Sequence, residues 1–502
     1  NANKDINFEV KTGEIHALLG ENGSGKSTLM NILSGIYSPD AGSIELFGKQ
    51  VTFSSPKDSI RAGIGMVHQH FKLVDVLTAK ENIIANGTDK LSDGFFTSGR
   101  KMTARIREIE DKYGLHLDPD KKVYNMSVSE KQTCEILKVL CRGAKILILD
   151  EPTAVLTPQE IRVLFDILRG MKKQGCSIII ITHKLAEVLE ISDRCTILRK
   201  GRSVGTINTA DTNARELTEL MVGRPISLDI ERDEPLPAGG KPLLDVKNLT
   251  VLDGQRLKAL DDVSFSLSGG EILGVAGIAG SGQRELLESI AGLYPVAEGS
   301  SIRYTPEGAP ESELVGKTPM QIKKSGVALA FVPEDRLGMG LVGSMGMTGN
   351  MMLRSWKKGK GVFVNRKDPN ELAMNIWKEL EVVTPSTEFP VRRMSGGNVQ
   401  KVLVGREIAS APNVLMSAYA VRGLDINTSY TIYNLMTEQK MKGVAVIFVG
   451  EDLDVLLELC DRILVLCGGK VSGIVDARTA TKEEIGLMMT RVGGGKEEAV
   501  HA

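Results

Sequence analysis

The chain has 502 residues with a formal net charge of -1; 42% of the residues are hydrophobic and 25% are charged. These proportions are typical of a soluble globular protein. The near-neutral balance argues against a dedicated nucleic-acid binder, which would carry a basic excess. Six cysteines without a CxxC pair indicate free thiols in a reducing compartment rather than a disulfide framework or a zinc site. No apolar stretch reaches the roughly 18 residues that span a bilayer.

The N-terminal segment begins at Asn1, without Met and without a signal peptide. We therefore expect an incomplete N-terminus, and a cytosolic protein unless a partner carries it to a membrane.

A strand over residues 15–19 is predicted to lead into a glycine-rich segment and then a helix from Ser27 to Leu33. The segment between them fits the phosphate-loop pattern GxxxxGK[ST], in which backbone N–H groups and a helix N-terminus converge on phosphates. Lys26 is expected to reach the β- and γ-phosphates, and the Ser27 hydroxyl to ligate Mg²⁺. A plain glycine turn is the alternative. The predicted ATP-binding residues of this loop are Gly20, Glu21, Asn22, Gly23, Ser24, Gly25, Lys26, Ser27 and Thr28.

Two later apolar runs, residues 146–149 and 178–181, predict buried parallel strands with a helix from Pro158 to Leu168 between them, and hence an α/β fold. The first run ends in Asp150 and Glu151. Beside a phosphate loop, Asp150 is expected to hold the Mg²⁺ hydration shell and Glu151 to polarise the attacking water. An acidic turn after a strand would be the preferred interpretation only if the motif stood alone.

A helix start at Ser127 has the pattern of a capping box with Glu130. The glutamate would neutralise its own helix N-terminus and repel a phosphate. A structural cap is therefore the preferred interpretation of this motif.

The second half of the chain repeats the first. Residues 2–25 align without a gap to residues 259–282, and Ser127 pairs with Ser395. Such self-similarity predicts two copies of one domain. The predicted boundaries are residues 1–226 for the first nucleotide-binding domain with its incomplete N-terminus, 227–241 for a linker, 242–492 for a degenerate second domain and 493–502 for a tail.

The second phosphate loop, residues 277–284, is altered at its two chemical positions. Gln283 replaces the lysine and Arg284 replaces the Mg²⁺-binding serine. A neutral amide compensates phosphate charge less, and a guanidinium cannot ligate a cation. Ala418 and Tyr419 stand where the two carboxylates stood, so hydrolysis is not expected in the second copy.

The second copy has the better glycine-rich helix start, Ser395-Gly396-Gly397-Asn398. Ser395 is expected to cap the helix, and the glycines to let its N-terminus approach a γ-phosphate closely.

The order of these motifs resembles that of ABC-transporter ATPases. The resemblance includes Val67-His68-Gln69 and Ile181-Thr182-His183. It implies that Gln69 is the Q-loop residue and a metal ligand, and that His183 contacts the γ-phosphate. Glu334 and Glu451 hold the corresponding positions in the second copy. The catalytic residues are thus predicted to be Glu151, His183 and Gln69, and the metal ligands Ser27, Gln69 and Asp150.

In that family two nucleotide domains pair head to tail. The resemblance therefore implies that the intact phosphate loop is completed by the signature residues 395–398 of the other copy. Asp425 matches the D-loop aspartate and would join this site, whereas the first copy has Thr157 there. One competent composite site and one degenerate site are expected.

Over essentially the whole chain, the tandem layout is similar to the fused ATPase subunits of bacterial importers for ribose, galactose and nucleosides. Residues 66–71, 150–159 and 332–336 are most similar to the nucleoside branch, whereas Val399 and residues 419–421 depart from the family pattern. The fold implied is two tandem P-loop NTPase domains, each with a RecA-like α/β core, a helical signature subdomain and an antiparallel β region. The stretch that supplies the adenine-stacking aromatic in this family falls upstream of Asn1.

The same resemblance implies integral-membrane permease subunits as partners, and through them an extracytoplasmic substrate-binding protein. The protein would be peripheral, at the cytoplasmic face of the membrane. The basic segment 351–367, with Trp356 and Phe363, is either a partner contact or a solvated loop.

Two other classes are alternatives. A soluble tandem ATPase acting on ribosomes would be expected to keep both sites intact and to carry a long inter-domain arm. A regulatory nucleotide sensor would have no need of Glu151.

Overall fold

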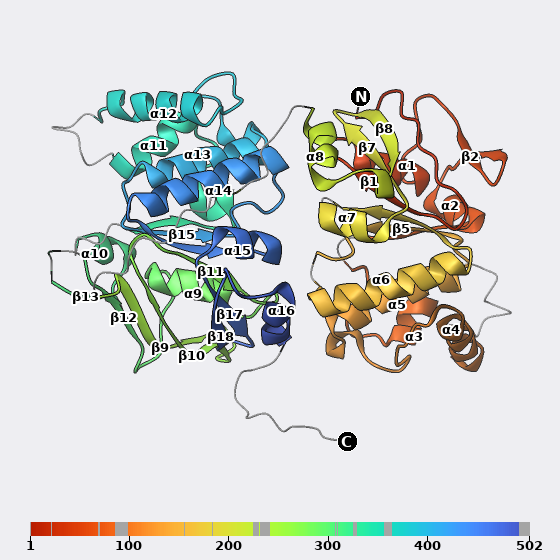
Figure 1. Ribbon diagram of the computed structural model, residues 1–502, viewed down its shortest axis with the longest axis horizontal. Helices are drawn as coiled ribbons and strands as arrows, with labels where there is room; N and C mark the ends of the chain where they lie inside the picture. The colour runs from red at the N-terminus through yellow and green to blue at the C-terminus, as the bar shows by residue number, and fades with distance from the viewer. Residues whose placement is uncertain are drawn as a thin grey trace. The chain divides into compact units, whose positions relative to one another are not determined.

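The computed structural model describes residues 2–21, 23–68, 71–85, 99–154, 156–182, 184–223, 230, 241–306, 308, 310–324, 329–355 and 364–490. The chain divides into two compact units, Asn1–Ser227 and Leu228–Ala502 (Figure 1). Most of the predicted linker and the whole predicted tail lie outside the described residues.

The first unit is built on a six-stranded sheet in the order β4-β5-β6-β1-β7-β8, in which only the edge strand β8 is antiparallel to its neighbour. Its strands are β1 (Ile15–Leu19), β4 (Ile64–Val67), β5 (Ile146–Asp150), β6 (Ser177–Ile181), β7 (Arg194–Arg199) and β8 (Arg202–Asn208), with a separate hairpin of β2 (Ile44–Leu46) and β3 (Lys49–Val51). Its helices are α1 (Lys26–Leu33), α2 (Pro56–Ala62), α3 (Ala79–Ile84), α4 (Gly99–Tyr113), α5 (Val128–Cys141), α6 (Pro158–Lys173), α7 (Leu185–Ile191) and α8 (Ala214–Val222).

The second unit has a six-stranded sheet in the corresponding order, β14-β15-β16-β11-β17-β18, and a four-stranded antiparallel sheet, β10-β9-β12-β13. Its strands are β9 (Leu244–Leu252), β10 (Lys258–Leu267), β11 (Ile272–Ala276), β12 (Ser301–Tyr304), β13 (Ser312–Glu313), β14 (Leu329–Val332), β15 (Val414–Ala418), β16 (Ala445–Val449), β17 (Arg462–Cys467) and β18 (Lys470–Asp476). Its helices are α9 (Gln283–Ile290), α10 (Pro319–Lys324), α11 (Met347–Ser355), α12 (Lys367–Glu379), α13 (Gly396–Ile408), α14 (Ile426–Met441), α15 (Leu453–Leu459) and α16 (Lys482–Thr490).

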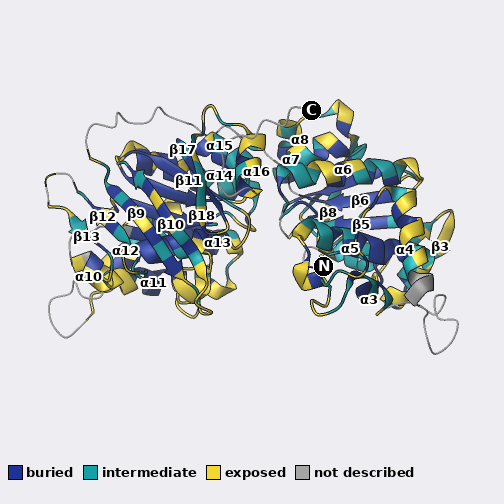
Figure 2. Ribbon diagram, turned by 90° about the horizontal axis from the view of Figure 1, so that it is seen from below, coloured by how far each residue is buried: buried dark blue, intermediate teal, exposed yellow. Residues whose placement is uncertain are grey.

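The central strands of the two six-stranded sheets are apolar on both faces because both faces are covered: by helices on either side in the first unit, and by helices on one side and by α9 with the four-stranded sheet on the other in the second. Successive residues of a strand point to opposite faces. In β5, Leu147 and Leu149 accordingly belong to the core under α5 and α6, while Ile148 belongs to the core under α1. Figure 2 shows these strands as the most deeply buried part of each unit.

Corresponding strands of the two units pair in the same register. Ile15 of β1 pairs with Ile178, and its counterpart Ile272 of β11 pairs with Val446. The expected tandem fold with parallel strands is confirmed, and in the first unit the antiparallel region is the hairpin β2–β3. Residues 2–10, which align with β10, form no strand, and the helix predicted from Pro158 continues to Lys173.

An ionic framework, partly exposed in the first unit and buried in the second, is duplicated as well. Asp193 accepts a hydrogen bond from the backbone N–H of Ile15 (2.9 Å) and forms an ion pair with Lys172 (2.5 Å). In the second unit Asp461 binds the N–H of Ile272 (2.9 Å) and Lys440 (2.7 Å) in the same way. Each framework fixes the start of the strand that leads into a phosphate loop.

Among the described residues, no helix combines the length and the apolar character that crossing a bilayer requires.

Candidate functional site

The first phosphate loop joins the buried strand β1 to helix α1. Gly25 is the N-cap of α1 with φ of 103°, a left-handed conformation that favours glycine. A Cβ at Gly25 would also collide with the side chain of Asn3. Glycine is thus required at this turn, as the phosphate-loop pattern predicts. Asn22 lies outside the described residues.

The Lys26 ammonium folds back into its own loop. Its Nζ donates to the carbonyl oxygens of Gly20 (2.5 Å) and Glu21 (3.0 Å). Burial lowers the pKa of Lys26, and the nearby charges of Glu151 and Asp150 oppose that shift. The lysine therefore lies in the field of both predicted carboxylates.

Asp150 and Glu151 stand at the end of β5. Burial and the charge of Glu151 raise the pKa of Asp150, while Lys26 lowers it. Glu151 has φ of 46°, and its backbone N–H donates to the carbonyl of Ile181 at the end of β6 (2.8 Å). The two carboxylates therefore repel each other electrostatically. A cation bound between them would reduce that repulsion.

The donor set fits Mg²⁺, a hard cation that takes oxygen ligands and retains water. Asp150 offers a carboxylate and Ser27 an exposed hydroxyl on the first turn of α1. The described residues contain no cluster of three or more acids, histidines and cysteines suited to a metal.

Gln69 and His183 lie outside the described residues. The strands that precede them, β4 and β6, are the two neighbours of β5 and run parallel to it. The ends of these three strands therefore meet at one edge of the sheet, where Asp150 and Glu151 stand.

The capping box at the start of α5 is confirmed. The Ser127 hydroxyl accepts from the N–H of Glu130 (3.2 Å), and the Glu130 carboxylate accepts from the N–H of Ser127 (2.8 Å). Lys121 also pairs with Glu130 at 2.7 Å. The helix N-terminus is thus closed by its own carboxylate.

In the second unit the start of α13 is open to solvent. The Ser395 hydroxyl accepts from the N–H of Asn398 (3.5 Å) and from its Nδ2 (2.8 Å), and Ser395 and Gly396 are exposed. No carboxylate lies in the first turn. An exposed, glycine-rich N-terminus of this kind can accept an anion.

Asp425 is the N-cap of α14. Its carboxylate accepts from the N–H of Thr428 (2.9 Å) and from the Thr428 hydroxyl (2.8 Å). A Cβ at Gly397 would lie 3.1 Å from Thr428 Oγ1 and 3.2 Å from Asp425 Oδ2. The structure thus brings the predicted D-loop aspartate against the signature glycine.

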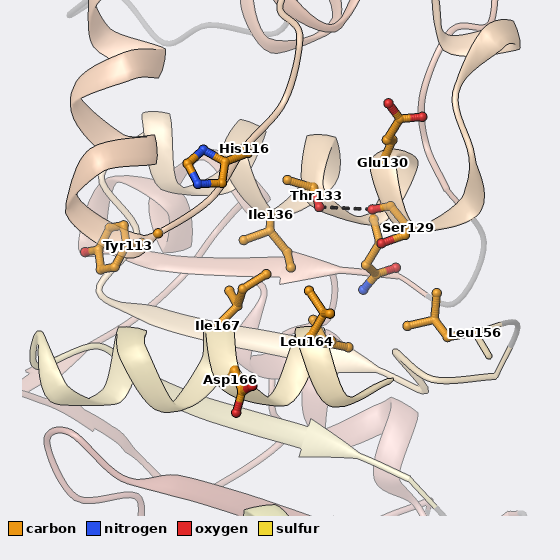
Figure 3. A pocket seen from close by; sticks show the side chains of 13 residues that line it. Tyr113, His116, Ser129, Glu130, Thr133, Ile136, Leu156, Leu164, Asp166 and Ile167 are labelled. Carbon is orange, nitrogen blue, oxygen red and sulfur yellow. Dashed lines mark hydrogen bonds between the residues drawn. The ribbon is translucent and has the colours of Figure 1, made fainter. Parts of the chain in front are cut away.

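The corresponding helices of the first unit enclose a cavity of about 430 Å³ between α5 and α6 (Figure 3). Ser129, the counterpart of Gly397, is one of its lining residues. Ile136 and Leu164 line its apolar interior, while His116 and Glu130 lie toward its edge. Sequence reasoning did not predict this cavity, which contains no residue of the predicted ATP site.

The second phosphate loop keeps the backbone of the first without its chemistry. Gly282 caps α9 with φ of 99°. Gln283 Nε2 donates to the carbonyl of Ile278 (3.1 Å), as Lys26 does to Glu21, and Arg284 pairs with Glu288 within α9 (2.6 Å).

A residue that sequence reasoning missed is Arg422, whose partner Glu334 also acts electrostatically on Arg284 of this loop. Arg422 pairs with Glu334 at 2.7 Å and with Glu451 at 3.3 Å. The available signal was an arginine at the position of Ala154, in a copy with glutamates at the positions of Gln69 and His183, which we call the switch positions.

The basic segment 351–367 is only partly described. Met351 is buried, and Arg354 pairs with the buried Glu407 at 2.5 Å, so both contact their own unit. Trp356 and Phe363 lie outside the described residues.

Comparison with known proteins gives a consistent result. Residues 3–154 and 260–417 match the family model described as ABC transporter. The chain is 41% identical to the guanosine import ATP-binding protein NupO of Bacillus subtilis, and 40% identical to the nucleoside import ATP-binding protein NupA of Lactococcus lactis subsp. cremoris. Each comparison covers 99% of this chain and 96% of the relative. The ribose import ATP-binding protein RbsA 1 of Rubrobacter xylanophilus is 38% identical over 99% of this chain and 95% of its own.

A solved structure titled RNase-L Inhibitor resembles the chain with a TM-score of 0.58 at 17% identity, covering 91% of this chain and 84% of that one. This likeness concerns the fold alone.

Proposed function

This chain belongs to the ABC transporter family and is an ATPase of the tandem import type, and from that membership we propose that it hydrolyses ATP at one competent composite site. The phosphate loop and acid pair of the first unit would supply one half of that site. Residues 395–398 and Asp425 of the second unit would supply the other half. The remaining pair of motifs would form a degenerate site.

The observation that carries the proposal is the unequal chemistry of two equivalent backbones. In the first unit Lys26 is influenced electrostatically by both Asp150 and Glu151. In the second, the corresponding positions carry Gln283, Ala418 and Tyr419. The two helix starts differ in the opposite sense from the two phosphate loops. The helix start that is closed by a carboxylate is in the first unit, and the open one is in the second.

The roles of the chain's own residues follow from their chemistry. Lys26 would leave the loop carbonyls and bind the β- and γ-phosphates, and Glu151 would orient and polarise the attacking water. Ser27, Asp150 and Gln69 would hold Mg²⁺, which neutralises phosphate charge when it is bound. His183 would contact the γ-phosphate, and Ser395 with the N–H groups that follow it would stabilise that phosphate from the other side.

The transported substrate is proposed to be a nucleoside. NupO and NupA are named for guanosine and nucleoside import, and their identities exceed that of the ribose relative by 2 to 3 percentage points. Integral-membrane permease subunits and an extracytoplasmic binding protein would complete the importer, with this chain at the cytoplasmic face. A simple sugar is the second candidate, because a relative named for glucose import in Haloferax volcanii is 39% identical over 99% of this chain.

The variant Glu151→Gln tests the catalytic site. We expect hydrolysis to fall at least 100-fold while Mg-ATP still binds with one tight site per chain, because only the water-polarising charge is lost. Tyr419→Phe is the matched control at the equivalent position and should keep turnover within twofold. Undiminished turnover in Glu151→Gln, or two hydrolysed ATP molecules per chain in a single turnover, would contradict the proposal.

The substrate is tested in the reconstituted importer. Nucleosides should stimulate its ATPase activity and ribose or glucose should not. If only a sugar stimulates the ATPase activity, the transported substrate is a sugar and not a nucleoside.

A further inference from the structure

Arg422 of the second unit holds together two segments that are far apart in the sequence. Its Nη1 pairs with Glu334 Oε1 at 2.7 Å, and its Nε with Glu451 Oε1 at 3.3 Å. Glu334 follows β14 and Glu451 follows β16, the two strands that flank β15. One guanidinium therefore joins the ends of three neighbouring strands.

The two glutamates stand at the switch positions of their domain. Glu334 lies two residues after β14, as Gln69 lies two residues after β4, and Glu451 lies two residues after β16, as His183 does after β6. In the first unit these are the residues that we assign to the metal and the γ-phosphate. In the second unit a protein cation connects them directly.

The residues around Arg422 do not fit a metal-bound nucleotide. Arg284 stands in place of the metal-binding serine and Ala418 in place of Asp150. Burial and the charges of Glu451 and Glu334 raise the pKa of Tyr419 to about 12, so its phenol stays neutral. Both switch carboxylates are already paired with a guanidinium, which a divalent cation would have to displace.

Arg422 is also connected to the signature helix. The Arg336 guanidinium donates through Nη2 to the carbonyl oxygen of Arg422. The other terminal nitrogen, Nη1, lies 3.2 Å from the position that a Cβ of Gly396 would occupy, at the first turn of α13. Among the described residues, Arg336 forms no ion pair. Arg336 thus links the backbone of Arg422 to the immediate surroundings of the signature helix start.

We propose that Arg422 is a built-in cation that replaces a metal-bound nucleotide at the second unit's own phosphate loop. It is a positioning residue: it fixes the switch positions and, through Arg336, the first turn of α13. The second unit can then present residues 395–398 in an ordered state without binding a nucleotide of its own. This inference rests on the proposed function, in which those residues complete the competent site.

An ordinary surface ion pair is the competing explanation, because Arg422 is half exposed and such pairs contribute little to stability. The two explanations differ in what happens at the signature. Loss of an ordinary pair leaves α13 unchanged. Loss of a positioning cation loosens the first turn of α13 and lowers the fraction of molecules ready to bind ATP.

The test is Arg422→Gln, with hydrogen exchange measured in metal-free and nucleotide-free protein. We expect peptides over residues 334–340 and 394–400 to exchange at least fivefold faster than in the wild type. We also expect the KM for ATP to rise about tenfold with kcat within twofold, because preorganisation is lost while the catalytic groups are intact. The double variant Glu334→Gln with Glu451→Gln should reproduce both effects, and Arg422→Lys should recover part of the loss.

The matched control is Arg303→Gln, which removes another half-exposed arginine–glutamate pair of the same unit, with Glu311 at 3.4 Å. It should change neither measurement. Unchanged exchange and KM in a folded Arg422→Gln protein would overturn the inference, as would a second tight Mg-ATP per chain in the Glu151→Gln background. Persistent hydrolysis in Glu151→Gln would instead overturn the proposed function, and the exchange experiment does not depend on turnover.

Discussion

Glu151 and Tyr419 occupy equivalent positions and share one unusual backbone conformation. Their φ angles are 46° and 49°, in the left-handed region that non-glycine residues rarely adopt. Each donates its backbone N–H to the last residue of the neighbouring strand: Glu151 to Ile181 at 2.8 Å, and Tyr419 to Val449 at 3.0 Å. The second unit thus has at Tyr419 the same left-handed turn that the first unit has at Glu151, although Tyr419 carries no carboxylate. A turn that is present both with and without a carboxylate indicates that the turn has a structural role.

Asp150→Asn is expected to stabilise the nucleotide-free protein while abolishing hydrolysis. Burial and the charge of Glu151 raise the pKa of Asp150, so folding disfavours its ionised form. The resulting loss of folding free energy is complete when the pH is above the raised pKa of the folded protein. It decreases as the pH falls through that pKa and vanishes below the pKa of the carboxyl in the unfolded chain. We expect the Tm of the first unit to rise by about 1–3 °C at neutral pH.

Calorimetry at two pH values checks this sign. The difference in Tm between Asp150→Asn and the wild type should narrow as the pH is lowered toward 4, because the wild-type carboxyl becomes protonated. A lower Tm for the variant at neutral pH would show that the attraction between Lys26 and the Asp150 carboxylate outweighs the effects of burial and of the charge of Glu151.

Much of the fold was predictable because the sequence is repeated and because its apolar runs end in chemically distinctive residues. The run before Asp150 predicted β5, and the two helix starts predicted the caps at Ser127 and Ser395. These features are local, so neighbouring residues along the chain specify them.

The features that sequence reasoning missed depend on tertiary contacts. Arg422 is 88 residues from Glu334, and its neighbours along the chain do not mark the contact; only a comparison of the two copies gives a signal. The cavity beside Ser129 depends on how closely two helices approach each other, which helix periodicity does not specify.

Gly397→Ser is expected to reduce turnover with little effect on stability. A Cβ at this position would lie 3.1 Å from Thr428 Oγ1 and 3.2 Å from Asp425 Oδ2, so the first turn of α13 must shift by a few tenths of an ångström. Serine forms helix better than glycine by several tenths of a kcal/mol, which offsets the crowding. Because the shifted turn would contact the γ-phosphate, we expect kcat/KM to fall about tenfold.

Ser129→Gly in the first unit is the matched reverse change. It removes a Cβ from the cavity wall between α5 and α6 and should leave kcat/KM within twofold, because the proposed competent site does not use that helix start. Equal losses in the two variants would argue against the unequal roles of the two signatures.

Arg194→Ala is expected to destabilise the first unit through the carboxylate that it leaves behind. Arg194 holds the buried Glu14 with two hydrogen bonds, at 2.7 and 3.0 Å. Burial alone would raise the pKa of Glu14, but the bonds from Arg194, Lys11 and His16 lower it to about 2. Removing the guanidinium leaves a buried carboxylate without its cation, which typically costs about 3 kcal/mol.

The pH dependence distinguishes this effect from lost packing. A depressed carboxyl pKa stabilises the folded state above the unfolded value near 4.5, and the contribution is lost as pH falls toward 2. The difference between Arg194→Ala and the wild type should therefore be largest above pH 5 and should shrink in acid. Arg462→Ala removes the equivalent partner of Glu271, at 2.6 Å, and should lower the unfolding transition of the second unit instead. A loss independent of pH in Arg194→Ala would assign the effect to packing of the arginine stem rather than to the charge of Glu14.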